Sequence, residues 1–254
     1  MDVFRTDRIR NVVLLGHGGA GKTTLAEAMA YLAGMTNRLG RVEDGNTVSD
    51  YDKEEIKRQF SISTSLIPLE YEGDDGPMKI NILDTPGYFD FVGEVEEAIS
   101  VADAAIIVVN CKAGIEVGTE KAWELCEKYR LPKLIFVTNM DDDHASFREL
   151  VLKLERRFGR SVAPFQLPIR ENEKFVGYVN VVKMGGRRFT NLSDYEECEI
   201  PEYSKKNLGI ARDALLEAVA ETSEEYMERY FSGEEFTLDE IQGALREHVI
   251  DGSI

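Results

Sequence analysis

The chain has 254 residues, of which 43% are hydrophobic, so it is long and apolar enough to bury the core of a globular protein. Its 47 acidic residues exceed its 30 basic residues and give a net charge of -17, which argues against a broad surface for naked nucleic acid and against sequence-specific nucleic-acid binding. No stretch approaches a membrane span, and the three cysteines lack metal-ligand spacing, so we expect reduced thiols in a cytoplasmic, monomeric protein.

A phosphate-binding loop is predicted between residues 16 and 23. The apolar run from Asn11 to Leu15 precedes it, which gives the order of strand, loop and helix that a P-loop requires. Its glycines let backbone N–H groups turn toward phosphate oxygens, while the Lys22 ammonium would reach the β- and γ-phosphates and the Thr23 hydroxyl would bind Mg²⁺. The alternative, a glycine-rich surface turn, is disfavoured by the complete pattern. The predicted nucleotide-binding residues here are Gly16, His17, Gly18, Gly19, Ala20, Gly21, Lys22, Thr23 and Thr24.

A helix is expected to begin at Thr23 and to end near Gly34, because Leu25, Ala28, Met29 and Leu32 recur at helical spacing. From Thr36 to Phe60 the chain is polar and has little periodicity. Long connections of this kind are usually functional or mobile. We therefore interpret it as a switch segment that a ligand orders.

Two strands are predicted next, at 61–70 and 78–83, with a turn over 73–77 between them. The second strand ends in Asp84-Thr85-Pro86-Gly87. An acid at the end of an apolar strand can hold Mg²⁺ through water, and the Gly87 N–H can meet a γ-phosphate. Alone, this tetrapeptide could be an ordinary turn, but its place some sixty residues after a P-loop favours a second phosphate sensor.

Strands and helices then alternate as far as residue 163, which predicts an α/β fold with a doubly wound, mostly parallel sheet of the P-loop NTPase class. A small α+β insertion domain is predicted over 164–254. It should contain a strand at 174–182, a partner strand after a Gly185-Gly186 turn, and three helices. Thr222 with Glu225 and Thr237 with Glu240 form capping-box patterns that predict two of the helix starts.

Several segments together resemble the GTP-binding domain of translational GTPases, and among these that of elongation factor G. They are GHGGAGKTTLAEA, the segment from Arg58 to Ser63, DTPGYFDFVGEVEEA and the run from Val101 to Thr119, all in the family's order and spacing. PFQLPIRENEKFVGYVNVVKM is similar to the start of the insertion peculiar to elongation factor G. The resemblance covers essentially the whole chain. It implies GTP and GDP as ligands, Mg²⁺ as cofactor, GTPase activity, and the factor-binding region of the large ribosomal subunit as partner.

The resemblance also implies the roles of the residues. Lys22, Gly87 and Tyr88 stand at catalytic positions, Thr23, Ser61 and Asp84 at metal-binding positions, and Asp84, Thr85, Pro86 and Gly87 at nucleotide-binding positions. Because the family continues into a Ser-Ala loop that contacts guanine and into four further domains, the chain is expected to be an N-terminal fragment with weakened affinity and little hydrolysis of its own.

Two departures from the family pattern concern hydrolysis. Ser61 replaces the usual threonine and keeps the hydroxyl. Tyr88 replaces the usual histidine, which orients the attacking water. Since a phenol loses its proton only near pH 10 and cannot become a cation, it is a poor base near neutrality. A tolerated aromatic on a mobile loop and a real loss of hydrolysis are both open, and we expect slowed rather than abolished turnover.

A third departure concerns the choice of base. The family's Asn-Lys-Met-Asp aligns with Thr138-Asn139-Met140-Asp141, in which Asp141 can accept hydrogen bonds from guanine. An offset alignment of Asn139 with Asp142 is possible, but it displaces the strand by one residue, so we favour the first. Asn139 lacks the lysine stem that packs along the base.

Three other readings remain open. The first is a GTP-dependent ribosome binder that hardly hydrolyses, and the second is a ribosomal protection or release factor. The third, a P-loop ATPase or kinase, is disfavoured by the paired switch motifs and Asp141.

Overall fold

The computed structural model describes residues 3–73, 76–159, 162–172 and 174–251. The chain divides into two compact units, Met1–Thr138 and Asn139–Ile254. Each is described by itself. The predicted domain boundary between residues 163 and 164 stays a prediction. The division into compact units places the helix at 147–158 with the second unit, but it does not test which segments fold on their own.

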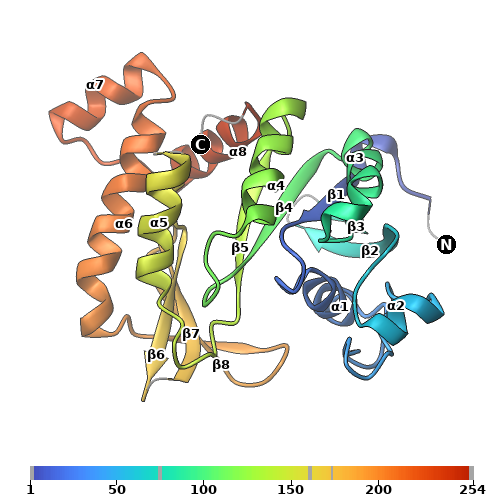
Figure 1. Cartoon of the computed structure of the whole chain (residues 1–254). Helices are drawn as coiled ribbons and strands as arrows, with labels where there is room; N and C mark the ends of the chain where they lie inside the picture. Colours follow the sequence, from blue (N-terminus) through green and yellow to red (C-terminus); the bar gives the residue numbers. More distant parts are fainter. Residues whose placement is uncertain (1–2, 74–75, 160–161, 173, 252–254) are drawn as a thin grey trace. The chain divides into compact units, whose positions relative to one another are not determined.

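The first unit is built on a five-stranded sheet with the order β2-β3-β1-β4-β5 (Figure 1). Only the β2 and β3 pair is antiparallel, and the other neighbours are parallel, which confirms the predicted α/β class with a mostly parallel sheet. The strands are β1 (Ile9–Leu15), β2 (Ser65–Gly73), β3 (Gly76–Asp84), β4 (Ala104–Asn110) and β5 (Lys133–Thr138). The helices are η1 (Thr6–Arg8), α1 (Lys22–Leu32), α2 (Lys53–Arg58), η2 (Phe89–Phe91), α3 (Val92–Ser100) and α4 (Val117–Tyr129).

Alternation along the strands divides the core of this unit between the two faces of the sheet. Leu14 packs with Ala26 and Ala30 of α1, whereas its neighbours Val13 and Leu15 are equally buried and point to the opposite face. Because parallel neighbours bring their carboxyl ends to one edge, the residues that follow β1 and β3 lie side by side. Leu14 pairs with Asp84.

Strand β2 begins at Ser65, four residues later than predicted. The backbone N–H groups of Ile62 and Ser63 donate to the Glu55 carboxylate at 2.9 and 3.1 Å, and that of Thr64 donates to Glu94 at 2.7 Å. These groups are therefore not available for a sheet ladder. Gly73 pairs with Gly76, and the residues between them in the predicted turn lie outside the described residues.

The second unit packs a four-stranded antiparallel sheet, of order β6-β7-β8-β9, against helices. The strands are β6 (Gln166–Glu171), β7 (Lys174–Asn180), β8 (Gly185–Phe189) and β9 (Tyr195–Cys198), and the helices are α5 (Phe147–Phe158), α6 (Glu202–Ala220), α7 (Glu224–Ser232) and α8 (Leu238–Asp251). Its buried core joins Val179 of β7 to Leu215 of α6 and Ile241 of α8. The three predicted helices are confirmed.

The predicted Gly185-Gly186 turn is wrong, because both glycines belong to β8 and the turn falls on the four residues before them. A Cβ on Gly186 would lie 2.7 Å from the carbonyl oxygen of Cys198, so the glycine allows β9 to approach β8. Met184 ends the turn with φ 52°. The sequence therefore indicated a special backbone position for a close strand pair, not for a turn.

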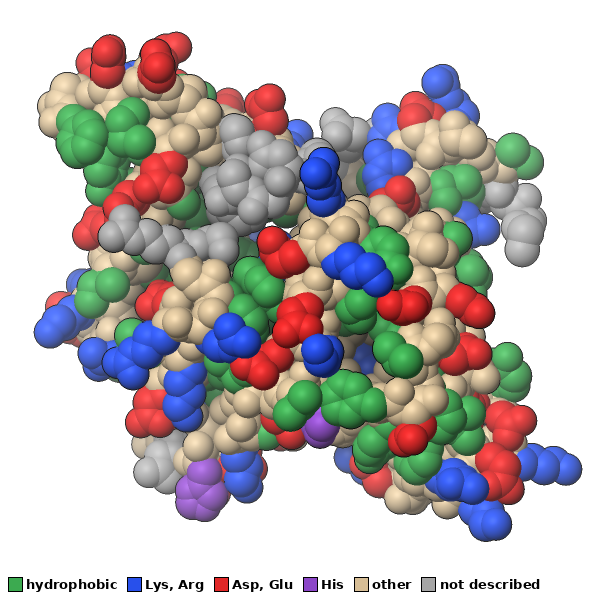
Figure 2. All heavy atoms as spheres, turned by 45° about the horizontal axis from the view of Figure 1, so that its top comes forward, with side chains coloured by type: hydrophobic (Ala, Val, Ile, Leu, Met, Phe, Trp, Pro, Cys, Tyr) green, Lys and Arg blue, Asp and Glu red, His purple; other side chains and the backbone are tan. Residues whose placement is uncertain are grey.

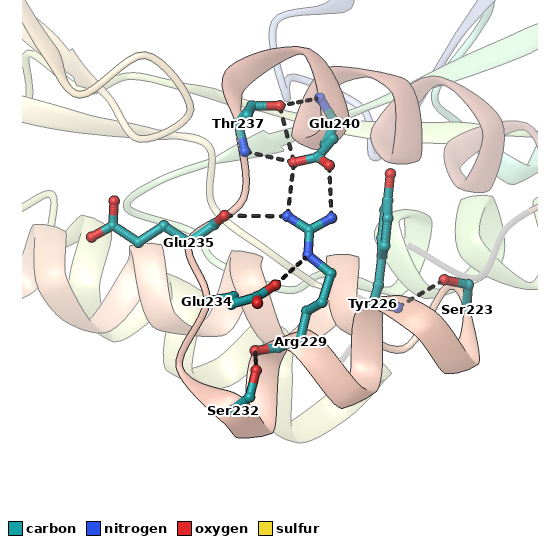
Figure 3. Close-up of polar contacts among 8 residues, drawn as sticks. All are labelled: Ser223, Tyr226, Arg229, Ser232, Glu234, Glu235, Thr237 and Glu240. Atoms are coloured by element: carbon teal, nitrogen blue, oxygen red, sulfur yellow. Dashed lines mark hydrogen bonds and ion pairs between the residues drawn. The ribbon is translucent and has the colours of Figure 1, made fainter.

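The ends of α7 and α8 are tied together by Arg229 (Figure 3). Its guanidinium donates to Glu240 at 2.7 Å and to Glu234 at 3.2 Å. The capping box of Thr237 and Glu240 is confirmed, since Thr237 N donates to Glu240 at 2.7 Å and Glu240 N to the Thr237 hydroxyl at 3.3 Å. The predicted box of Thr222 and Glu225 is wrong, because Ser223 is the N-cap of α7 and accepts from the Tyr226 N–H, while the Thr222 hydroxyl donates to the carbonyl oxygen of Val219.

Acidic and basic side chains are interspersed over much of the face shown in Figure 2. In the part of the chain that the structure describes, no helix has the length and apolar character needed to cross a bilayer.

Candidate nucleotide site

The loop between β1 and α1 has a backbone that only glycine adopts easily. Gly16, Gly19 and Gly21 have φ angles of 139°, 80° and 97°. A side chain at Gly16 would also overlap the carbonyl oxygen of Val108 in β4. The loop is thus shaped by its glycines into a turn directly before the first turn of α1, where unpaired N–H groups attract anions. We call residues 16–23 the cradle.

Lys22 is only 6% exposed and its ammonium lies within the cradle. It donates to the carbonyl oxygens of Gly16 at 3.0 Å and His17 at 2.9 Å. Burial lowers the pKa of Lys22 to about 8, an effect that the negative charges of Asp84 and Glu116 oppose. A buried cation of this kind would be stabilised by an anion in the loop.

The backbone of His17 packs against α4. The start of α4 packs on it, since a Cβ on Gly118 would lie 2.5 Å from the His17 Cα. Its Nε2 is 3.6 Å from Glu116, and its buried Nδ1 has no hydrogen-bond partner. Ala20 is buried, whereas the Thr24 side chain is exposed.

Four oxygen-bearing side chains form a chain beside Lys22. The Thr23 hydroxyl donates to Asp84 at 2.8 Å, the Ser61 hydroxyl donates to Asp50 at 2.7 Å, and the two hydroxyl oxygens are 3.2 Å apart. Asp50 Oδ2 and Asp84 Oδ1 are buried without a hydrogen-bond partner. This set brings together all three predicted metal-binding residues and adds Asp50, which the sequence analysis missed.

The charged forms of the two carboxylates in this hydrogen-bonded set, Asp84 and Asp50, are disfavoured by burial. Burial raises the pKa of Asp84 to about 6, although the Thr23 hydrogen bond and Lys22 oppose this. Burial also raises the pKa of Asp50. The negative charges of Glu55 and Glu27 raise it further, whereas the hydrogen bond from Ser61 lowers it. Unpaired buried carboxylate oxygens beside hydroxyl lone pairs fit a hard, oxygen-seeking cation such as Mg²⁺. Within the described residues, no group of three or more His, Cys, Asp or Glu could hold a metal by itself.

The predicted switch segment is anchored through two buried glutamates that sequence analysis did not single out. Glu27 of α1 is 1% exposed and accepts from the backbone N–H groups of Gly40, at 3.0 Å, and of Val48. Glu55 of α2 is 3% exposed and fixes Ile62 and Ser63, as described above. These carboxylates hold the segment that carries Asp50 and Ser61 close to the cradle helix. Glu27 is a polar residue within a predicted helix and Glu55 lies in a stretch with little periodicity, so the spacing of apolar residues identifies neither of them.

The segment after β3 also lies on the cradle. The Thr85 hydroxyl donates to the carbonyl oxygen of Leu14 at 2.6 Å, and Pro86 is buried. A Cβ on Gly87 would lie 2.5 Å from Lys22 Nζ and 2.6 Å from Gly18 N. Tyr88 is 43% exposed and its ring lies against Gly18.

The predicted base-contacting residues fall in both units. Thr138 ends β5, and its hydroxyl donates to the carbonyl oxygen of Ala20 at 2.7 Å, so it supports the cradle. Asn139 has φ 54°, Met140 is buried and Asp141 is exposed, and all three belong to the second unit. Asp142 accepts from the His144 N–H at 2.8 Å in a local turn. The structure therefore unites the cradle, Ser61, the segment Asp84 to Tyr88 and Thr138 in one unit.

Comparison with known proteins agrees with this geometry. Residues 7–239 match the family model described as the elongation factor Tu GTP binding domain. The chain is 36% identical over 247 residues to elongation factor G of Thermotoga petrophila, which covers 96% of this chain and 35% of that protein. It is also similar to a solved structure of a protein from Thermus thermophilus, with a TM-score of 0.89, 38% identity, and coverage of 96% of this chain and 36% of that one.

The chain thus spans about a third of the length of these relatives. The matched family model, the identity along nearly the whole chain and the shared fold agree with one another and with the cradle described above. The chain belongs to the family of translational GTPases, as a GTP-binding domain of the elongation factor G type.

Proposed function

We propose that this chain binds GTP and GDP with Mg²⁺ in the cradle and hydrolyses GTP as the switch domain of an elongation factor G-like protein on the ribosome. The observation that carries the proposal is the convergence of buried Lys22 with the oxygen chain of Thr23, Ser61, Asp84 and Asp50. We further propose that the chain acts as a monomer in the cytoplasm and contacts the factor-binding region of the large subunit.

Within the cradle, Lys22 neutralises the β- and γ-phosphates, and the N–H groups of the glycine-rich loop donate to their oxygens. The Gly16 and His17 carbonyls hold the ammonium within the loop. Phosphate oxygens there would give it charged acceptors, whose hydrogen bonds are stronger than those of neutral ones.

Thr23, Ser61 and Asp84 would hold Mg²⁺, with Asp50 behind Ser61. The metal supplies charge stabilisation at the phosphate oxygens when it is bound. Asp50 lies in the switch segment and Asp84 at the end of β3. The contacts from Asp50 through Ser61 and Thr23 to Asp84 therefore connect the two segments that approach the cradle. Release of the metal site on hydrolysis would free the switch segment.

Guanine would be selected by Asp141, while Thr138 supports the cradle through its hydrogen bond to Ala20. The engagement of the Asp142 carboxylate in a local turn supports the alignment that assigns this task to Asp141. Tighter binding of GTP than ATP by the chain, reversed or lost in Asp141→Asn, is the expected result. Equal affinity for the two nucleotides would contradict guanine selection and favour an ATPase.

Tyr88 is proposed to stand where the attacking water is oriented. Replacing Tyr88 with histidine should raise ribosome-stimulated hydrolysis by on the order of 10- to 100-fold, because imidazole can act as an acid or base near pH 7. The measurement is the single-turnover release of phosphate by the longer, ribosome-competent protein, with Tyr88→Phe as the matched variant that removes only the hydroxyl. Equal rates for Tyr88 and histidine would contradict this assignment.

A second candidate is a GTP-dependent ribosome-binding module with little hydrolysis, which the phenol at position 88 favours. The two functions are separated by the lifetime of the GTP complex on ribosomes. Rapid turnover supports the first proposal, and a long-lived GTP complex supports the second. A ribosomal protection or release factor would share this domain and differ in later ones.

A further inference from the structure

Gly18 differs from the other glycines of the cradle in what would oppose a side chain at its position. Gly16, Gly19 and Gly21 have φ angles in the left-handed region, but Gly18 does not. A Cβ placed on Gly18 would instead lie 2.8 Å from Cζ of Tyr88 and 3.0 and 3.1 Å from its two Cε atoms. Backbone conformation therefore permits a side chain at position 18, and the atoms nearest to its Cβ all belong to the Tyr88 ring.

The contact involves the phenol end of the ring. Cζ and both Cε atoms belong to the hydroxyl end of the ring and lie nearer to this Cβ than the hydroxyl oxygen does, so the face of this end of the ring lies over Gly18. The preceding residue supports the same placement, because Gly87 stands over Lys22 Nζ and Gly18 N. Two successive residues of the segment after β3 thus rest on the cradle.

The Tyr88 ring also contacts the switch segment. Phe60 approaches it edge to face, with ring centroids 4.8 Å apart and an interplanar angle of 62°, and Phe60 also lies 6.4 Å from the Phe91 ring. Phe60 directly precedes Ser61, whose hydroxyl is part of the oxygen chain. It follows Gln59, which ends α2 with φ 58° and so turns the chain toward this contact.

We infer that Gly18 and Phe60 form a seat for the Tyr88 ring that holds its hydroxyl end over the cradle before any ribosome is present. The inference rests on the proposed function, because it assigns both as positioning residues for the reaction at that site. Gly18 gives the ring room, and Phe60 limits its escape. The choice of residue at position 18 is thereby coupled to that at position 88.

A double-mutant cycle tests the coupling. Gly18→Ala should displace the tyrosine ring, whereas the same change in a Tyr88→Ala background should cost less, because the ring atoms nearest to the added methyl group are gone. Unfolding free energies of the nucleotide-free chain measure this without reference to activity. Gly93→Ala in α3 is the matched control, since a Cβ there meets nothing within 4 Å. Equal costs of Gly18→Ala in both backgrounds would overturn the seat.

Turnover distinguishes positioning from packing alone. In the longer protein with ribosomes, Gly18→Ala and Phe60→Leu should each lower kcat by on the order of 10- to 100-fold, as expected for a displaced group at a reacting centre, with a smaller change in KM. Replacing Tyr88 with histidine should rescue the Gly18→Ala variant by more than it accelerates the parent, because the smaller ring tolerates the added methyl group.

Each outcome separates the two claims. If the parent binds no guanine nucleotide or is not stimulated by ribosomes, the proposed function fails, and the stability cycle still decides the seat. If the parent turns over normally but Gly18→Ala lowers kcat equally with tyrosine or histidine at position 88, the positioning role is wrong. Stability coupling together with an unchanged kcat would also overturn it.

Discussion

Replacing Lys22 with methionine should reduce the affinity of the chain for GTP and GDP by roughly 30-fold or more, since truncating a buried charge that bonds a charged partner costs about 2–5 kcal/mol. The methionine keeps the apolar stem, so the loss reports the ammonium itself. Titration with a fluorescent GDP analogue in the presence of Mg²⁺ measures the change.

The loss should not arise from unfolding. In the nucleotide-free chain, two effects of the substitution oppose each other. Removing a cation whose pKa burial lowers to about 8 relieves up to about 3 kcal/mol of desolvation. Losing its hydrogen bonds leaves the Gly16 and His17 carbonyls without that donor, which costs about 1–3 kcal/mol each when a buried partner is left unsatisfied. We therefore expect the two effects to offset each other in part and the melting temperature to fall modestly, with the chain still folded at the temperature of the titration.

The matched control is Lys128→Met in α4, where the side chain is 60% exposed and its ion pair with Glu96 is 3.4 Å long. Surface pairs of this kind contribute little, so both affinity and melting temperature should be unchanged. Undiminished nucleotide affinity in Lys22→Met would contradict the assignment of the cradle.

The parts of the site that the sequence predicted are those encoded by local pattern. The cradle follows from the spacing of glycines, a lysine and a threonine between a strand and a helix, and Asp84 follows from its place after an apolar run. Both positions depend on neighbours in the chain, and the parallel pairing of β1 with β3 then brings them together.

The parts that were missed depend on contacts between distant residues. Asp50 acts through Ser61, and Glu27 acts through Val48, which is 21 residues away. Neither contact has a spacing that a single sequence displays. The start of β2 was misplaced for the same reason, because carboxylates from α2 and α3 take the N–H groups that the alternating pattern assigned to a strand.

In the second unit, local signals competed with one another. Two consecutive glycines indicate a turn as readily as a close strand pair, and the neighbouring strand decides between them. β9 is short and carries two glutamates, a composition typical of a protected sheet edge but weak as a strand signal. Adjacent Thr222 and Ser223 can both cap a helix, and the structure uses Ser223.

Asp84→Asn should have opposite effects on the empty and the loaded chain. Burial raises the pKa of Asp84 to about 6 from an ordinary value near 4, so the folded chain binds more protons than the unfolded chain between those pH values. The unfolding free energy of the metal-free parent should consequently fall as the pH rises from about 4 to about 6 and remain low above that window. The asparagine variant lacks this contribution while its amide oxygen can still accept from Thr23.

At pH 7.5 with a chelator, the asparagine variant should therefore be more stable than the parent, by up to about 3 kcal/mol. With Mg²⁺ and GDP at about 1,000 times the Kd of the parent the order should reverse, because the ligand then stabilises the folded parent by about 4.1 kcal/mol, whereas the variant has lost a group that would hold the metal and gains less. Chemical denaturation at several pH values, with and without ligand, measures both effects. Asp213→Asn on the exposed face of α6 should change neither. An equal gain in stability from Mg²⁺ and GDP in parent and variant would show that Asp84 is not part of the metal site. Equal stability of parent and variant without metal would show that other groups balance the buried charge of Asp84 in the parent.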